Sequence, residues 1–256
     1  MANTIQTFKK YIVGLLDEVY KMAALTSVLD GAAELASQGA NANELIIPKI
    51  DMDGLGDYSP SAGYVAGDVT FTNETVKCNF DRGRMFNVDN VENMDTAGMA
   101  FGRLAGEFIR TKVVPELDAF RFAQYCGITG NAVTQSAGAY ASGEALRAAI
   151  AAKYDAMTNA EVPVTGRVLF ITPANNGMLR DLDNNKSRAL IDSFDSVVVV
   201  PQNRFYTAIK QNDGTTSGEK AGGYTKATTG KNLEFLIIEK SAVIQYQNHV
   251  APKIIS

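Results

Sequence analysis

The side chains that could carry catalysis or hold a metal are few and far apart in this sequence. It has one histidine, His249, and two cysteines, Cys78 and Cys126. A nucleophile–histidine pair would have to use that one histidine, and a zinc site would need three or four Cys or His ligands. The cysteines are interpreted as small buried apolar residues or as free thiols. We therefore predict no catalytic residue and no metal site.

Two short motifs approach ligand-binding patterns but leave them incomplete. Residues 223–231 (GYTKATTGK) end like a phosphate-binding loop, yet Thr225 replaces its first glycine and Asn232 replaces the required Ser or Thr. Asp51 and Asp53 begin like a calcium loop, but the later ligands do not follow. The sequence therefore predicts no cofactor.

A set of carboxylates interleaved with arginines precedes a predicted helix. Paired carboxylates can act as general acid and base. No pattern typical of a cleft accompanies them, so we interpret them as ion pairs that fix a strand-to-helix junction or an interface. The set comprises Asp81, Arg82, Arg84, Asp89, Glu92 and Asp95.

The composition is that of a globular protein and excludes several classes of partner. Of 256 residues, 46% are hydrophobic and 20% are charged, with a net charge of −4. A nucleic-acid-binding protein would usually carry a basic stripe, and no apolar run approaches the ~18 residues of a membrane span. The N-terminus lacks the features of a signal peptide. We expect a protein kept in a cytoplasm, with no membrane partner and no sequence-specific nucleic-acid binding.

The first half of the chain predicts elements that a single copy cannot cover. Apolar residues from Thr4 to Ala24 recur every three or four positions, which is typical of an amphipathic helix. This helix either docks on its own domain or packs on a neighbouring subunit. Residues 44–50, with Pro48 restricting them to an edge, and residues 68–80 predict a long hairpin. An isolated hairpin is marginally stable in water, so another surface must cover it.

Two details of these elements are predicted from residue order. The apolar positions of 68–80 change parity near Asn73 and Glu74, which indicates a bulge or a strand that contacts different surfaces along its length. Residues 97–125 predict a helical spine of about 40 Å. Pro115 lacks an N–H and disfavours helical geometry at Val114, so we expect a kink there.

The second half predicts a small α/β domain followed by more strands. Ser142 caps a helix, and a further helix spans 175–182. A glycine-rich stretch, 210–231, is expected to be a long exposed loop. The expected strands are 167–172, 196–200, 233–238 and 242–246.

Several segments, in sequence order, cover a turn-rich hairpin tip, the second hairpin arm, the spine and the entry into the C-terminal domain. The segments are Gly56-Asp57-Tyr58, Gly63-Tyr64-Val65-Ala66-Gly67, Asn79-Phe80-Asp81-Arg82-Gly83-Arg84, Val88-Asp89, residues 107–121 (EFIRTKVVPELDAFR), Glu161-Val162-Pro163, residues 166–170 (GRVLF) and Pro173. Together they resemble the major capsid proteins of tailed bacteriophages with the Hong Kong 97-type fold.

This resemblance implies an α+β fold of five parts and a structural function. The parts are an N-terminal arm (1–43), an extended β-hairpin loop (44–92), a peripheral domain with the spine helix (93–134), an axial α/β domain (135–246) and a C-terminal tail (247–256). Copies of the chain would form hexamers and pentamers of an icosahedral virion capsid, assembled in the bacterial host cytoplasm. Further partners would be a scaffolding protein, a portal and packaged double-stranded DNA bound without sequence specificity.

Contacts between subunits are expected from four residues of the hairpin tip: Asp57, Tyr58, Gly63 and Tyr64. Tyrosine supplies rigid apolar area and a hydrogen bond, which suits interfaces. Asp81 and Arg82 are expected to pair at the hairpin base. The alternative for the tip residues is that they stabilise turns within one subunit. At the level of function, the alternatives are an encapsulin-like shell around an enzyme cargo and a small α/β enzyme using residues 166–201.

Overall fold

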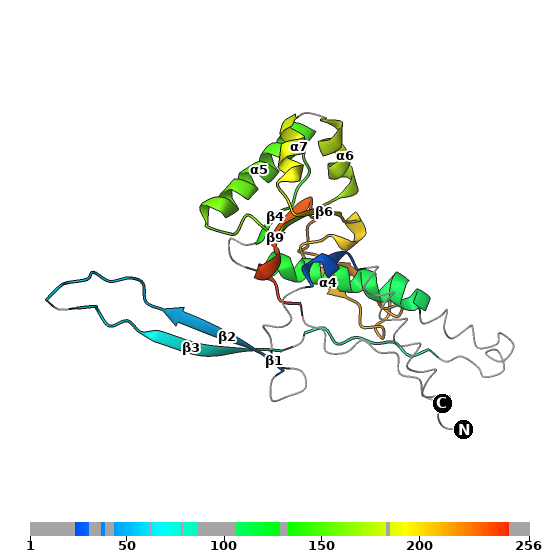
Figure 1. Cartoon of the computed structure of the whole chain (residues 1–256). Helices are drawn as coiled ribbons and strands as arrows, with labels where there is room; N and C mark the ends of the chain where they lie inside the picture. The colour runs from blue at the N-terminus through cyan, green and yellow to red at the C-terminus, as the bar shows by residue number, and fades with distance from the viewer. Residues whose placement is uncertain are drawn as a thin grey trace, which may run out of the picture. The chain divides into compact units, whose positions relative to one another are not determined.

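The chain folds as two compact units, seen here in a computed structural model (Figure 1). Unit 1 comprises residues 1–30, 88–243 and 250–256, and unit 2 comprises residues 31–87 and 244–249. The expected N-terminal helix and the tail 247–256 lie outside the described residues. The described residues are 24–30, 37–38, 44–61, 63–77, 79–86, 106–128, 133–182 and 185–245.

Unit 1 is built on a four-stranded sheet of order β4-β9-β5-β6, in which β5 and β6 are parallel and the other pairs are antiparallel. Every residue of β5 and β9 is buried. Apart from Arg167 and Glu239, the residues of both strands are apolar, because helices cover both faces of the sheet. The strands are β4 (Val133–Ser136), β5 (Arg167–Ile171), β6 (Ser196–Val199) and β9 (Phe235–Glu239).

Helices lie on both sides of this sheet, which makes the unit a mixed α+β structure (Figure 1). α4 lies against one face, while α5, α6 and α7 lie on the other. The helices are α4 (Val114–Gly127), α5 (Gly143–Asn159), α6 (Pro173–Asp181) and α7 (Asn185–Asp192), with short 3-10 turns η1 (Leu25–Leu29), η4 (Gln202–Arg204) and η5 (Lys240–Ala242).

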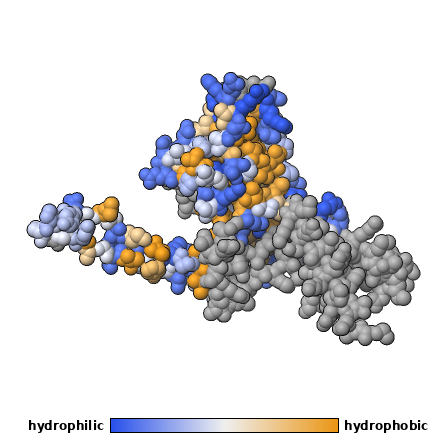
Figure 2. All heavy atoms as spheres, in the orientation of Figure 1, coloured by the Kyte–Doolittle hydropathy of each residue, from blue (hydrophilic) through white to orange (hydrophobic). Residues whose placement is uncertain are grey.

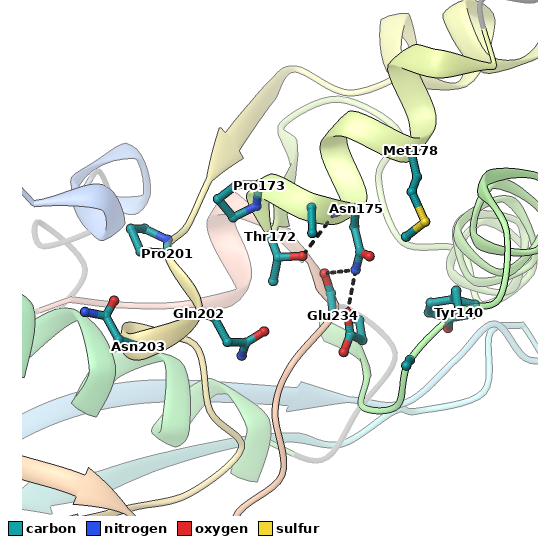
Figure 3. Close-up of a pocket in the computed structure, with 11 residues that line it drawn as sticks. Tyr140, Thr172, Pro173, Asn175, Met178, Pro201, Gln202, Asn203 and Glu234 are labelled. Carbon is teal, nitrogen blue, oxygen red and sulfur yellow. Dashed lines mark hydrogen bonds between the residues drawn. The ribbon is translucent and has the colours of Figure 1, made fainter.

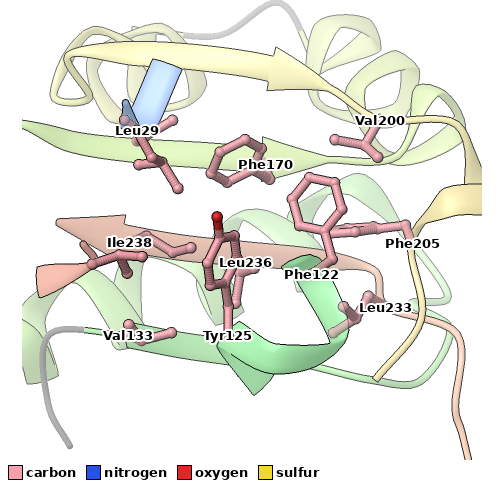
Figure 4. Packing of buried hydrophobic residues seen from close by; sticks show 12 residues of the cluster. Leu29, Phe122, Tyr125, Val133, Phe170, Val200, Phe205, Leu233, Leu236 and Ile238 are labelled. Carbon is pink, nitrogen blue, oxygen red and sulfur yellow. The ribbon is translucent and has the colours of Figure 1, made fainter. Parts of the chain in front are cut away.

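Strand alternation divides the core into two layers. On the α4 face, Phe122 makes edge-to-face contacts with Phe170 at 5.1 Å and with Phe205 at 5.0 Å between ring centroids (Figure 4). On the other face, Leu169 packs with Leu146 of α5. Because neighbouring residues of β5 point to opposite faces, residues 168 and 170 join the α4 layer, whereas residues 169 and 171 join the α5 layer.

The start of α5 confirms the expected cap. The Ser142 hydroxyl accepts a hydrogen bond from the Ala145 N–H. Gly143 follows because a Cβ there would lie 2.5 Å from the Met178 carbonyl oxygen of α6. The small residue therefore lets α5 begin in close contact with α6.

Replacing Ser142 by alanine is expected to lower the free energy of unfolding by about 1 kcal/mol, because the Ala145 N–H loses its acceptor. Urea unfolding followed by circular dichroism measures this change. Ser142→Asp restores an acceptor at the same place and should recover most of the loss. Equal stability of the alanine and wild-type chains would contradict the capping role.

A fully buried arginine ties β5 to the end of α5. Arg167 donates to the carbonyl oxygens of Tyr154, Val162 and Pro163 at 2.6–3.1 Å, and its guanidinium lies 4.3 Å from the centre of the Tyr154 ring. It also donates to the Thr158 hydroxyl at 2.9 Å. These acceptors replace the water that the guanidinium loses on burial, so Arg167 has a structural role here.

The spine passes through Pro115 by a change of hydrogen-bonding pattern. A π-helical segment, η3 (Ile109–Val113), leads directly into α4, with the Val114 N–H bonded to the Ile109 carbonyl oxygen. Val113 and Val114 keep right-handed helical dihedrals, and Pro115 occupies the first turn of α4. Proline is tolerated at that position because its missing N–H is not needed there. The kink itself stays a prediction.

A buried carboxylate joins η1 to the spine. Asp118 of α4 is fully buried and accepts hydrogen bonds from the backbone N–H groups of Leu25 and Thr26, at 3.1 and 3.2 Å, and from the Thr26 hydroxyl at 2.8 Å. Arg204 of η4 donates to the same carboxylate at 3.3 Å. Three segments distant in sequence therefore meet at one side chain.

Two expectations for unit 1 are wrong. The stretch 210–231 is not all loop, because β7 (Ile209–Gln211) pairs with β8 (Tyr224–Lys226). Polar groups order the turn between them: the Asp213 carboxylate accepts from the Thr215 and Thr216 N–H groups at 2.8 Å. The Thr216 hydroxyl, which also donates to this carboxylate, and then these two bonds hold the Asp213 pKa well below its usual value.

The second error is the expected strand 242–246, whose described part contains no strand. The chain forms η5 instead, because the Glu239 carboxylate accepts from the N–H and hydroxyl of Ser241 and turns the backbone. Strand β4 and helix α7 were not predicted.

Unit 2 contains a three-stranded antiparallel sheet of order β1-β2-β3. The strands are β1 (Ser37–Gln38), β2 (Glu44–Met52) and β3 (Val69–Lys77). Of the two interpretations of the parity change near Asn73, the bulge is wrong, because β2 and β3 pair without interruption from Glu44↔Lys77 to Met52↔Val69. The same register places Val69 and Phe71 on one side of β3 and Val76 on the other. Within the described residues, β2 pairs on its other side with β1 only at residues 45 and 46. At Pro48, β2 is therefore an edge strand with β3 as its one neighbour there.

A candidate assembly surface on the hairpin

The uninterrupted register gathers four large apolar side chains on one face of the hairpin. Directly opposed residues of an antiparallel pair point to the same side, and Ile50 opposes Phe71 while Met52 opposes Val69. All four are between 55% and 73% exposed. We call this set, Ile50, Met52, Val69 and Phe71, the hairpin face.

The opposite side of the same strand segment is polar. There Lys49 opposes Thr72 and Asp51 opposes Thr70, and Lys49 forms an ion pair with Glu74. Figure 2 shows hydrophobic residues spaced along this hairpin. In this segment the apolar side chains are therefore sorted to one side, which is the pattern of a strand pair with one buried face. Nearer the hairpin base, Ile47 and Val76 lie on the other side.

The hairpin tip is a structured turn closed by two tyrosines. The Tyr58 and Tyr64 rings lie 4.9 Å apart. Between them, Ser59 and Gly63 exchange backbone hydrogen bonds of 2.8 and 3.3 Å. Gly63 has φ +78°, a left-handed conformation that favours glycine. Further down, the Asp68 N–H donates to the Asp53 carboxylate at 2.9 Å, which extends the strand pairing towards the tip.

The structure brings Tyr58, Gly63 and Tyr64 together at the tip, with Asp57 exposed beside them. Tyr64 is 88% exposed, although it contacts Tyr58. The tyrosines thus stabilise the turn and still present a ring surface to a partner. Their contact with another subunit stays a prediction. Asp81 and Arg82 are exposed on the segment 79–86, and their pairing also stays a prediction.

Sequence reasoning missed the hairpin face itself. It found that the apolar positions of the second arm change parity near Asn73 and Glu74 but did not pair that arm with the first. Pairing the two arms would have revealed the face, because a register that places Ile50 opposite Phe71 also places Met52 opposite Val69. Exposed apolar side chains continue beyond the strands at Leu55 and Val65.

Unit 1 contains one further candidate, an open pocket at the carboxyl ends of the parallel strands β5 and β6 (Figure 3). Ligands of α/β sheets commonly bind at this edge. The cavity measures about 730 Å³. Its lining residues are Ala139, Tyr140, Thr172, Pro173, Ala174, Asn175, Met178, Pro201, Gln202, Asn203 and Glu234.

Within the described residues, little else could do chemistry. No group of three His, Cys, Asp or Glu side chains among them is arranged to hold a metal. Burial raises the pKa of the Cys126 thiol to about 12, so the reactive thiolate is scarce at neutral pH. In the same part of the chain, no helix combines the length and apolarity that crossing a membrane requires.

Comparison with known proteins gives one weak structural likeness. A solved structure from Mycobacterium phage Che8 matches 82% of this chain and 82% of its own chain, with 15% sequence identity and a TM-score of 0.45. No protein-family model matches the sequence, and no curated protein does. A likeness of this size assigns neither family nor function, so the residues described above carry the functional inference.

Proposed function

We propose that this chain is the structural subunit of a tailed-bacteriophage head. Copies would assemble into hexamers and pentamers of an icosahedral shell around double-stranded DNA, in a Hong Kong 97-type arrangement. The observation that carries this proposal is the exposed hairpin face. Fully burying one such apolar side chain is worth about 1.5–3 kcal/mol, so covering all four strongly favours association with another surface.

The architecture of unit 2 supports a second copy of this chain as the partner. Every residue of β3 is exposed, and a hairpin with so little cover is marginal in water by itself. A closed shell supplies cover through repeated contacts between identical subunits, in which the same patch always meets the same neighbour patch. The sequence resemblance to phage major capsid proteins spans this hairpin and supports the choice of a second copy as the partner.

The remaining parts of the proposal follow from that role. A scaffolding protein and a portal would be further partners, and the subunit would assemble in the bacterial cytoplasm into a virion. DNA would be enclosed without sequence-specific contacts, which fits the net charge of −4, because phosphate affinity comes from Lys and Arg. No catalytic role is proposed for any residue.

Tyr64→Ala, or deletion of residues 57–66, is expected to leave a soluble subunit that fails to assemble, because the tip loses its partner-facing ring. Negative-stain microscopy of the expressed chain, alone and with its scaffolding protein, measures this as the presence or absence of capsomers, tubes or shells. Ser61→Ala is the control at the tip, since Ser61 makes one hydroxyl contact with Ser59. Normal shells from the Tyr64→Ala variant or from the deletion variant would refute the proposal.

The contents of the wild-type shells separate the two shell functions. Nuclease-protected DNA inside them favours a phage head, whereas a protein cargo favours an encapsulin-like shell.

A further inference from the structure

The pocket at the β5–β6 edge contains acceptor oxygens whose orientation is fixed. The Asn175 amide nitrogen donates to the Glu234 carboxylate at 2.6 Å and to the Glu234 backbone oxygen at 3.1 Å. Because both partners can only accept, the amide oxygen must point away from Glu234, as Figure 3 shows. Asn175 is 3% exposed, and no donor among the described residues reaches that oxygen. This oxygen is therefore available as an acceptor to a ligand in the pocket.

A second amide repeats this arrangement on the other side of the pocket. The Gln202 amide nitrogen donates to the Phe205 carbonyl oxygen at 2.8 Å. Its amide oxygen is consequently the atom left for a ligand. Both amides thus offer acceptors, and both are held in place by the fold rather than by a ligand.

The charge of the pocket is negative and uncompensated. Glu234 lines it, and no Lys, Arg or His does. Across the described part of the chain, no cation lies within ion-pair distance of the Glu234 carboxylate, which accepts from Asn175 through one of its two oxygens. Apolar groups of Tyr140, Pro173, Met178 and Pro201 supply the walls. A ligand with an alkyl stem and a cationic end matches this combination, and the Tyr140 ring adds a surface for the cation.

We propose that this pocket binds a lysine or arginine side chain presented by a short peptide segment of a partner protein. The cationic group would pair with Glu234 and donate to the Asn175 and Gln202 oxygens, while the stem packs on the apolar walls. A volume of about 730 Å³ lies in the range that takes ligands larger than one side chain, which favours a peptide over a free small cation. The proposal does not depend on the shell function.

Calorimetric titration of the full-length chain tests this with three probes: acetyl-alanyl-lysyl-alanine amide, its norleucine analogue and 1,4-diaminobutane. The lysine peptide is expected to bind at least about tenfold more tightly than the norleucine peptide, because hydrogen bonds to charged groups carry that much. Glu234→Gln keeps an acceptor for Asn175 but removes the charge, and should abolish the difference. Glu161→Gln, at an exposed carboxylate outside the pocket, should leave it unchanged.

Each other outcome overturns the proposal. Equal binding of the two peptides rejects the cation, and diamine binding as tight as the lysine peptide rejects a peptide occupant. Absence of saturable binding rejects the site. The wild-type chain gives a measurement that does not rely on a variant folding: the ¹³C-methyl signal of Met178, which lines the pocket, should shift with the lysine peptide. The signal of Met157, buried in the neighbouring core, should not.

Discussion

Replacing Asp118 by alanine is expected to lower the free energy of unfolding of the unassembled chain by about 3–5 kcal/mol, the cost of breaking a buried ion pair from one side. The carboxylate accepts from two backbone N–H groups, one hydroxyl and one arginine. Its removal leaves the buried Thr26 N–H without an acceptor and Arg204 without its counter-charge. Water cannot replace the lost acceptor at the Thr26 N–H, because Asp118 and Thr26 are fully buried, whereas the Arg204 side chain is 22% exposed and keeps part of its contact with solvent.

Urea unfolding of the variant, compared with Asp155→Ala on the exposed side of α5, measures this effect. The control removes an aspartate from a helix without removing a buried acceptor, so its change should stay within about 0.5 kcal/mol. Limited proteolysis adds a second readout, since loss of the Asp118 contacts should make cleavage within 24–30 faster. A change below about 1 kcal/mol for Asp118→Ala would show that the network contributes little.

The sheet of unit 1 was largely predictable, because strands β5, β6 and β9 consist mostly of apolar residues. Residues 167–172 and 233–238 are close to β5 and β9, and Ser142 caps α5 as its residue type and position indicated. Strand β4 was not predicted because its sequence, VTQS, has a single buried residue, Val133. The segment becomes a strand by pairing with β9. Tertiary pairing rather than local propensity decides such a strand.

The polar turns were the least predictable parts. Ile209 and Tyr224 are the large apolar residues of β7 and β8, and they are too few to indicate a hairpin. The order between the strands comes from Asp213 accepting backbone N–H groups and from the Lys210–Glu219 ion pair. Likewise, Asp118 is one carboxylate among many in the sequence. Its role depends on Leu25 and Thr26, more than ninety residues earlier, lying beside α4. Sequence spacing carries no signal for a contact of that range.

Sequence reasoning named residues that lie together at the hairpin tip, and it missed the hairpin face. Tyr58, Gly63 and Tyr64 were chosen from residue type, and the structure brings them together. The hairpin face needed the register, since a shift of one residue would place its members on opposite sides. Once the pairing Ile50↔Phe71 is known, the face can be tested by a substitution that distinguishes its two sides.

Phe71→Asp is expected to abolish assembly while leaving the subunit folded. Phe71 is 73% exposed in the chain, so its loss removes little folding energy. In an assembled state that covers the hairpin face, the new carboxylate would be buried without a partner, which costs about 2–5 kcal/mol per contact. At 1.4 kcal/mol per factor of ten, the concentration needed for assembly should rise at least about thirtyfold. Sedimentation velocity over a concentration series measures that shift.

Thr72→Asp is the matched control, because Thr72 is the next residue of the same strand and points to the polar side opposite Lys49. Both variants place an aspartate in β3 and add the same charge, so the cost of aspartate in a strand is shared. A difference between them isolates the side of the hairpin that a partner covers. If Phe71→Asp assembled at the wild-type concentration, or if both variants failed alike, the hairpin face would not be the surface that holds subunits together.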